Sequence, residues 1–149
     1  MLRGNHRQDI FFSSTDRERL DAIVAEVLGR FGARLHAYCW MTNLLHMPIQ
    51  VGDTPLGRIT LRIASRDARF LQTQFHTTGH LFERRHHAVL VDADTCLLEL
   101  LRYIQLNPVR ARMVDAPGEY PWSSHAVYLG GHSAPWVTTE FALSSSLSD

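Results

Sequence analysis

Apolar residues recur at helical spacing early in the chain. Their intervals of three and four residues are typical of a helix with one buried face. The positions are Leu20, Ile23, Val24, Val27, Leu28 and Phe31. Thr15 and Glu18 precede them with the spacing of a capping box, and Gly32 follows the last of them. The pattern predicts a helix over residues 15–31.

The next two apolar stretches favour β-structure. Residues 34–41 (RLHAYCWM) alternate in polarity and carry aromatic side chains, and residues 42–50 (TNLLHMPIQ) continue as a second strand after a tight turn at Thr42-Asn43. Pro48 cannot donate to a strand ladder, so this second strand is expected to lie at an edge or to end early.

The remaining pattern predicts four helices and one strand. A second helix is expected over residues 55–75, with Pro55 in its first turn, and a strand over residues 86–91 (HHAVLV). A third helix is expected to begin at Asp92 or Asp94 and to run through LLELLRYI. Asn107-Pro108 is expected to end it and to begin a short helix, PVRARMV, and SSHAVYLGG predicts a last short helix.

This order of elements predicts an α+β fold. Two helices over one face of a small antiparallel sheet would bury the apolar stripes, as in a ferredoxin-like sandwich. That fold begins with a strand, and few residues precede Arg3, so we expect the first strand to be missing or truncated. We expect one domain over residues 1–141 and a frayed tail over residues 142–149.

Composition narrows the class of protein. The chain has 149 residues, of which 45% are hydrophobic and 20% charged, which suits one globular domain. No apolar run approaches the roughly 20 residues that span a bilayer, and the N-terminus has no signal-peptide core, so we expect no membrane association and a cytoplasmic location. Cys39 and Cys96 are expected to be free buried thiols.

The charges are unevenly distributed although the formal net charge is zero. Every basic residue other than histidine is an arginine, and six of them lie between Arg58 and His87 with only Asp67 and Glu83 as acids. After Arg112 the chain carries acids but no arginine. A basic middle and an acidic end suggest one anion-binding face.

Four arginines follow one side of the second predicted helix. Arg58, Arg62, Arg66 and Arg69 recur at intervals of four, four and three residues. Such a row could follow a phosphate backbone, because each guanidinium can donate two hydrogen bonds to a phosphate. The alternative is a solvated helix face, with Asp67 as the nearby acid.

A second basic cluster lies at residues 80–87 (HLFERRHH). Arg84 and Arg85 on a short strand would form a phosphate-contacting edge. His76 and His80 have a spacing that could bind zinc on a helix, but the TTG sequence between them favours a turn, so the zinc site is the weaker alternative.

The segment RYIQLNP (102–108) and the histidine of TNLLHMPIQ carry the candidate chemistry. Tyr103 and Asn107 are four residues apart, so both side chains of a helix could reach one point. Tyrosine can act as a nucleophile, and the asparagine carbonyl can bind a hard cation. The alternatives are a helix N-cap at Asn107 and a tyrosine flanking the core. His46 alone could be a metal ligand or a core histidine.

Several motifs together resemble the single-tyrosine HUH transposases, of the insertion-sequence-200 type and the branch associated with repetitive extragenic palindromes. The similar segments occur in family order along nearly the whole chain, and RYIQLNPVRA followed by YPWSS is the most specific. They are RGNHRQDIFF, HAYCWMTNLLHM, GHLFERR, LLELLRYIQLNPVRARMV, YPWSSHAVYLG and WVTTE.

The resemblance implies a ferredoxin-like homodimer that binds hairpins in single-stranded DNA, then cuts and rejoins the strand beside them. Tyr103 matches the family's nucleophile, which forms a 5′-phosphotyrosine link. His46 and Asn107 match ligands of a Mg²⁺ (or Mn²⁺) ion, which would polarise the attacked phosphate.

The sequence departs from this family in its metal motif. Leu44 stands where the first histidine of the His-hydrophobic-His motif is expected, and leucine cannot bind a metal. Thr42 replaces the usual proline, and Pro48 replaces a strand residue. We therefore expect metal binding to be weakened or absent. We expect a transposase with impaired single-strand endonuclease activity, with a hairpin-binding module without chemistry as the alternative. A structural or regulatory domain without a DNA role is a third alternative.

Overall fold

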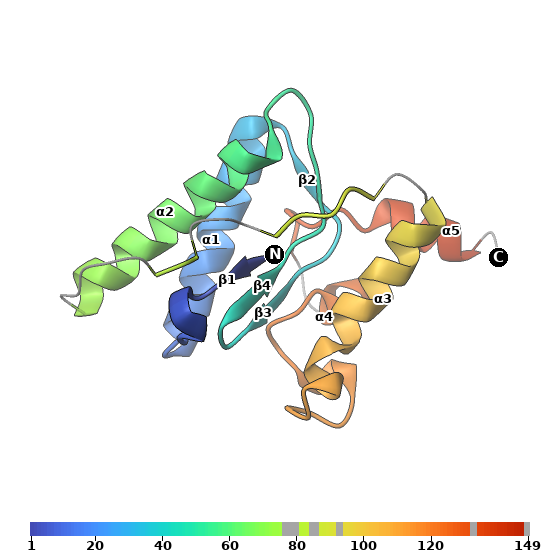
Figure 1. Cartoon of the computed structure of the whole chain (residues 1–149). Helices are drawn as coiled ribbons and strands as arrows, with labels where there is room; N and C mark the ends of the chain where they lie inside the picture. The colour runs from blue at the N-terminus through green and yellow to red at the C-terminus, as the bar shows by residue number, and fades with distance from the viewer. Residues whose placement is uncertain (76–80, 84–86, 92–93, 132–133, 148–149) are drawn as a thin grey trace. The chain divides into compact units, whose positions relative to one another are not determined.

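The computed structural model describes residues 1–75, 81–83, 87–91, 94–131 and 134–147, and within them the fold is α+β, as predicted (Figure 1). Helices and short strands follow one another from β1 to α5. Their bounds are β1 Leu2–Arg3, α1 Ser14–Phe31, β2 Arg34–Leu35, β3 Cys39–Met41, β4 Leu44–His46, β5 Ile49–Gln50, α2 Leu56–Phe75, α3 Asp94–Arg110, α4 His125–Tyr128 and α5 Glu140–Leu147. Short 3-10 helices cover Asn5–Arg7 and Pro117–Glu119.

The strands form two small antiparallel sheets. One has the order β1-β4-β3, with Leu2 opposite Leu45, and the other pairs β2 with β5. The first strand is therefore present but only two residues long, which agrees with the short form of the expectation and not with its complete loss. The two strands predicted over residues 34–41 and 42–50 are each broken into two, and β4 ends two residues before Pro48, as expected for a residue that cannot donate to a ladder.

The chain folds into two compact units. The first unit comprises residues 1–33, 42–45 and 51–88, and the second comprises residues 34–41, 46–50 and 89–149. The expectation of one domain over residues 1–141 stays a prediction.

In the first unit, α1 begins at Ser14, one residue before the start that the sequence predicted. Ser13 is the N-cap, its hydroxyl accepts from the Asp16 amide, and the Asp16 carboxylate accepts from the Ser13 amide. This capping box replaces the one predicted at Thr15 and Glu18, because Asp16 is buried there and Thr15 is exposed. Gly32 ends the helix with a φ of 62°, as predicted.

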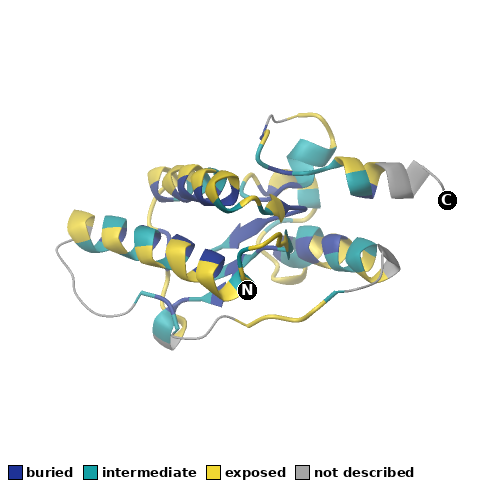
Figure 2. Ribbon diagram, turned by 90° about the horizontal axis from the view of Figure 1, so that it is seen from above, coloured by how far each residue is buried: buried dark blue, intermediate teal, exposed yellow. Residues whose placement is uncertain are grey.

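Helices α1 and α2 pack against each other in the first unit and supply much of its apolar core. The predicted apolar stripe of α1 is buried from Leu20 to Leu28, and Phe31 is half-buried. Ile59, Ile63 and Leu71 of α2 are also buried. Exposed positions alternate with buried ones along both helices (Figure 2), as expected for helices that bury one side.

One charged residue of α2 is also buried in this unit. Asp67 is 1% exposed. Burial raises the pKa of Asp67 to about 7, and the nearby Asp16 carboxylate raises it further than Arg19 lowers it. Asp67 is therefore a core residue and does not neutralise the arginines that follow the exposed side of α2.

The second unit holds α3 against β3. Leu101 and Ile104 are buried, and Ile104 packs with Cys39 and Tyr120. The YPWSS segment lies along β3, since Trp40 donates its amide to the Trp122 carbonyl at 2.8 Å. This segment of the family motif therefore supports the strand on which α3 packs.

Helix α3 continues through Asn107-Pro108, where the sequence predicted its end. It runs to Arg110 with Pro108 inside it. The proline falls in the last turn, so its missing amide costs one hydrogen bond close to an end that frays anyway. Asn107 is therefore not the N-cap of a new helix, and the separate helix PVRARMV does not form.

Two further expectations are corrected in the described residues. Residues 87–91 contain no strand, although the His87 amide donates to the Met1 carbonyl at 2.9 Å. Helix α5 runs over Glu140–Leu147, and the frayed tail expected over residues 142–149 stays a prediction. Cys39 is a buried free thiol as predicted, but Cys96 is exposed. No helix in the described part of the chain is long and apolar enough to cross a membrane.

Candidate active site and arginine face

Two of the predicted site residues are in direct contact in the second unit. The Asn107 side-chain amide donates to Nε2 of His46 over 2.9 Å, and both residues are half-buried. His46 comes from the end of β4 and Asn107 from the last turns of α3. The histidine therefore faces the helix that carries Tyr103 and is not isolated in the core.

Burial determines the charge state of His46. Loss of solvation lowers the pKa of its imidazole to about 4. The ring is therefore neutral at physiological pH, and the nitrogen that accepts from Asn107 carries a lone pair. A neutral imidazole nitrogen is the form that binds metal ions.

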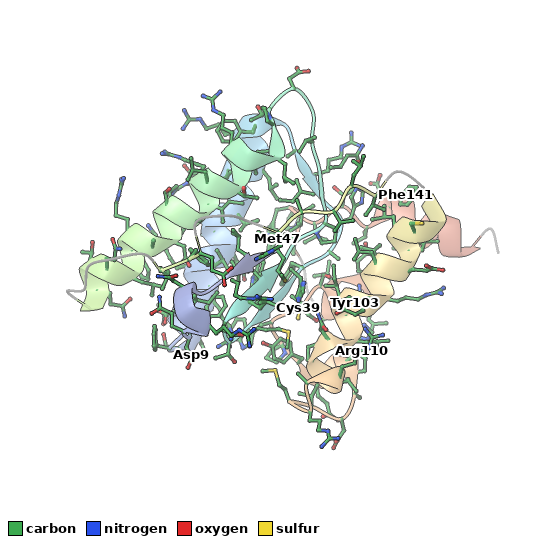
Figure 3. All side chains as sticks on the ribbon, in the orientation of Figure 1. Asp9, Cys39, Met47, Tyr103, Arg110 and Phe141 are labelled. Carbon is green, nitrogen blue, oxygen red and sulfur yellow. The ribbon has the colours of Figure 1, made fainter. Side chains whose placement is uncertain are left out.

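Tyr103 lies one helical turn before Asn107 and is accessible to solvent. Its side chain is 47% exposed. The Arg110 guanidinium carbon lies 4.5 Å from the centroid of the Tyr103 ring, and both residues extend from α3 (Figure 3). This contact was not among the sequence-based expectations. The two residues are seven positions apart, which is two helical turns, and this spacing could have indicated it.

Arg58, Arg62, Arg66 and Arg69 form what we call the arginine face of α2 in the first unit. Arg58, Arg62 and Arg69 are exposed, whereas Arg66 is half-buried and donates to Glu26 of α1 at 2.9 Å. This ion pair lowers the pKa of Glu26. The face thus keeps three exposed guanidinium groups, and its acidic neighbour is Glu26, not Asp67.

The other basic cluster falls outside the described residues. Arg84 and Arg85 were predicted to contact phosphate, and His76 and His80 were considered as zinc ligands. All four lie in residues 76–80 and 84–86, which the structure does not describe. Their roles stay predictions.

A family comparison covers the residues that form this site. The model for the family described as "Transposase IS200 like" matches residues 1–107, which include His46, Tyr103 and Asn107. This match spans more than half of the chain. The chain belongs to the IS200-like transposase family.

A solved structure shares the fold of this transposase-family chain. It is described as "Structure of the REP associates tyrosine transposase bound to a REP hairpin". Its TM-score is 0.73, its sequence identity is 15%, and the alignment covers 92% of this chain and 81% of that chain. At this identity the likeness concerns the fold. A search of curated proteins finds no match.

The side chains that the structure describes do not make a complete metal site in this transposase-family member. Among the described residues, no group of three or more His, Cys, Asp or Glu side chains lies together to hold a metal ion. His46 and Asn107 are both neutral and bond to each other. Mg²⁺ prefers oxygen ligands, usually with a carboxylate among them, so this pair alone fits the ion poorly.

Leu44 stands where the family resemblance implies a histidine. It lies two residues before His46 in β4, and alternate residues of a strand point to the same face. A histidine at position 44 would therefore present a second imidazole beside His46. The leucine supplies an apolar side chain there.

Proposed function

We propose that this IS200-like transposase binds hairpins in single-stranded DNA and that its arginine face contacts the phosphate backbone. Family membership supports a DNA substrate, and the similar solved protein is described as bound to a REP hairpin. Arg58, Arg62 and Arg69 are the groups available for such contacts. Guanidinium groups suit phosphates because they offer paired donors in one plane.

Tyr103 is the proposed nucleophile. Its phenolate oxygen would attack a DNA phosphorus and form an O–P bond while the bond from phosphorus to the 3′-oxygen breaks. The 3′-oxygen takes up a proton, and the 5′-phosphate remains on Tyr103. Attack by a second 3′-hydroxyl would reverse these bond changes and rejoin the strands. The exposure of Tyr103 leaves room for a DNA phosphate to approach.

We further propose that this chemistry is slow because the metal site is incomplete. The observation that carries this proposal is the direct hydrogen bond between His46 and Asn107, beside a leucine where a second histidine is needed. Loss of a metal ligand weakens an ion's affinity strongly, since even partners behind the ligands contribute about 10–100-fold. Mg²⁺ or Mn²⁺ is therefore expected to bind weakly.

Hairpin binding can be tested by a fluorescence titration. A fluorescein-labelled DNA hairpin with single-stranded flanks would be titrated with the wild-type protein and with Tyr103→Phe, beside a blunt duplex of equal length. We expect both proteins to prefer the hairpin and to lose affinity steeply with added salt. Affinity that does not depend on salt, or equal affinity for the duplex, would contradict the proposal.

The second candidate is a hairpin-binding module without chemistry. Leu44 favours it, because this residue removes a ligand and leaves the arginine face unchanged. Covalent protein–DNA adducts, separated on a denaturing gel, discriminate the two functions. Adducts in the wild type that disappear in Tyr103→Phe indicate the enzyme. Hairpin binding without adducts in either protein indicates the module.

A homodimer is the proposed assembly, since the family resemblance implies one. Sedimentation equilibrium with and without the hairpin would measure it. A mass of two chains in either condition supports the dimer, and a single-chain mass in both would contradict it.

A further inference from the structure

An open hollow of about 320 Å³ lies beside the arginine face in the first unit. Two side-by-side helices supply its walls (Figure 1): α1 gives its last two residues, and α2 gives residues of its first half. We call it the Phe31 hollow. Its lining residues are Arg30, Phe31, Arg58, Leu61, Arg62 and Ser65.

The lining of the Phe31 hollow carries three cations and no acid. Arg30, Arg58 and Arg62 have no ion pair with an acid among the described residues. The nearby Glu26 is bound by Arg66, and Arg62 has only a smaller effect on the pKa of Glu26. The hollow is therefore electropositive, which suits a negatively charged group.

Its remaining surface is apolar and aromatic. The guanidinium carbons of Arg30 and Arg58 lie 5.6 Å and 5.8 Å from the centroid of the Phe31 ring. Leu61 is 67% exposed at the same place. A bare phosphate would gain little from this surface, because an anion interacts with the cations alone. A ligand with a flat ring and a phosphate would use both.

We propose that the Phe31 hollow holds one unpaired nucleotide of the bound DNA. The base stacks on Phe31 and Leu61, and the guanidinium groups of Arg58 and Arg62 contact its phosphates. This inference rests on the proposed DNA-binding function and adds a base-binding subsite at one end of the arginine face. Any base can stack on an aromatic ring, so the subsite accepts an unpaired base of any sequence.

The volume of the hollow agrees with this ligand. Pockets for small molecules begin at about 300 Å³, so the size of the hollow suits a ligand as small as one nucleotide. The position also agrees, since Arg62 belongs both to the hollow and to the arginine face. A strand that follows the face from Arg69 toward Arg62 could therefore place its next unpaired base on Phe31.

The test distinguishes contacts to the base from contacts to the phosphates. Two fluorescein-labelled single strands of equal length would be used, oligothymidylate and the same backbone with abasic sites throughout. We expect Phe31→Leu to weaken binding of oligothymidylate by about tenfold, which is within the range measured for one stacked base, and to leave binding of the abasic strand unchanged. Phe31→Trp should retain the affinity for oligothymidylate.

Matched variants locate the effect. Phe12→Leu removes an exposed aromatic ring elsewhere in the same unit and should not change the preference for bases. Arg69→Gln removes a cation outside the hollow and should weaken both strands by the same factor. Unchanged unfolding midpoints would show that each variant is folded.

Each result has one meaning. If Phe31→Leu lowers the affinity for both strands equally, or for neither, the hollow does not bind a base. In that case a steep salt dependence of the affinity would still support the proposed DNA binding. If the wild type binds no strand and no hairpin, the proposed function and this inference both fail. Thymidine monophosphate should compete only weakly, and competition as strong as that of the oligonucleotide would assign the hollow to a free nucleotide.

Discussion

His46 and Asp67 are buried titratable residues whose pKa values move in opposite directions. Burial lowers the pKa of His46 to about 4 and raises the pKa of Asp67 to about 7. The unfolded chain binds more protons at His46 between about pH 4 and 6.5, so this residue lowers stability as pH falls. The folded chain binds more protons at Asp67 between about pH 4 and 7, so that residue lowers stability as pH rises.

The Asp67 effect predicts a pH-dependent stabilisation in Asp67→Asn. The amide cannot ionise, so the variant avoids burying a charge near Asp16 at high pH. We expect its free energy of unfolding to exceed that of the wild type by on the order of 2 kcal/mol at pH 8, and by less at pH 5. Urea unfolding at both pH values measures this, and an equal change at both would contradict the assignment.

The family motif named Tyr103, Asn107 and His46 as candidate site residues, and their roles stay predictions. The contact between Asn107 and His46 could not be read from the motif, because it depends on how α3 packs on β3. The hydrogen bond from Asn107 to His46 joins residues 61 positions apart, and no local pattern encodes it. Asp67 looked like a surface partner of the arginines because periodicity alone places a polar residue outside the core.

At the scale of elements, strong periodicity was reliable and local signals at element ends were less so. The apolar stripe fixed the position of α1, but two capping boxes competed at its start, and burial of Asp16 selected the one with Ser13. Asn107-Pro108 is a common helix-start signal, yet the packing of Leu101 and Ile104 carries α3 past it. Tertiary contacts therefore decided where these helices begin and end.

The capping box of α1 gives a prediction at this scale. Ser13→Ala removes the hydroxyl that accepts from the Asp16 amide, and we expect it to lower the free energy of unfolding by about 1 kcal/mol. Thr15→Ala, at the position favoured by sequence, should have little effect. Urea denaturation midpoints of the two variants measure this difference. A larger loss of stability in Thr15→Ala than in Ser13→Ala would show that Ser13 is not the N-cap.

At the scale of the whole molecule, we propose that the chain keeps a surface that binds nucleic acid while its reaction centre is weakened. The family match covers residues 1–107 and so includes both α2 and Tyr103. The arginine face needs only exposed cations, whereas the chemistry needs a complete ligand set. Binding can therefore persist after a change such as Leu44 reduces cleavage.

Salt dependence tests the arginine face as a unit. Each lost phosphate contact should reduce the slope of log affinity against log salt by about 0.7–0.9. We expect this change in Arg58→Gln, Arg62→Gln and Arg69→Gln. We expect a smaller one in Arg66→Gln, because Arg66 is already paired with Glu26. If all four variants have the same slope as the wild type, the arginine face does not contact the DNA phosphates.

The most direct test of the weakened reaction centre is the rate of Mg²⁺-dependent covalent attachment of a hairpin DNA, measured in the wild type and in Leu44→His. The variant restores a second imidazole beside His46. We expect slow or absent attachment in the wild type, an increase of about 10–100-fold or more in Leu44→His, and none when Tyr103→Phe is added. Wild-type attachment that is already fast and that Leu44→His does not increase would contradict an incomplete metal site.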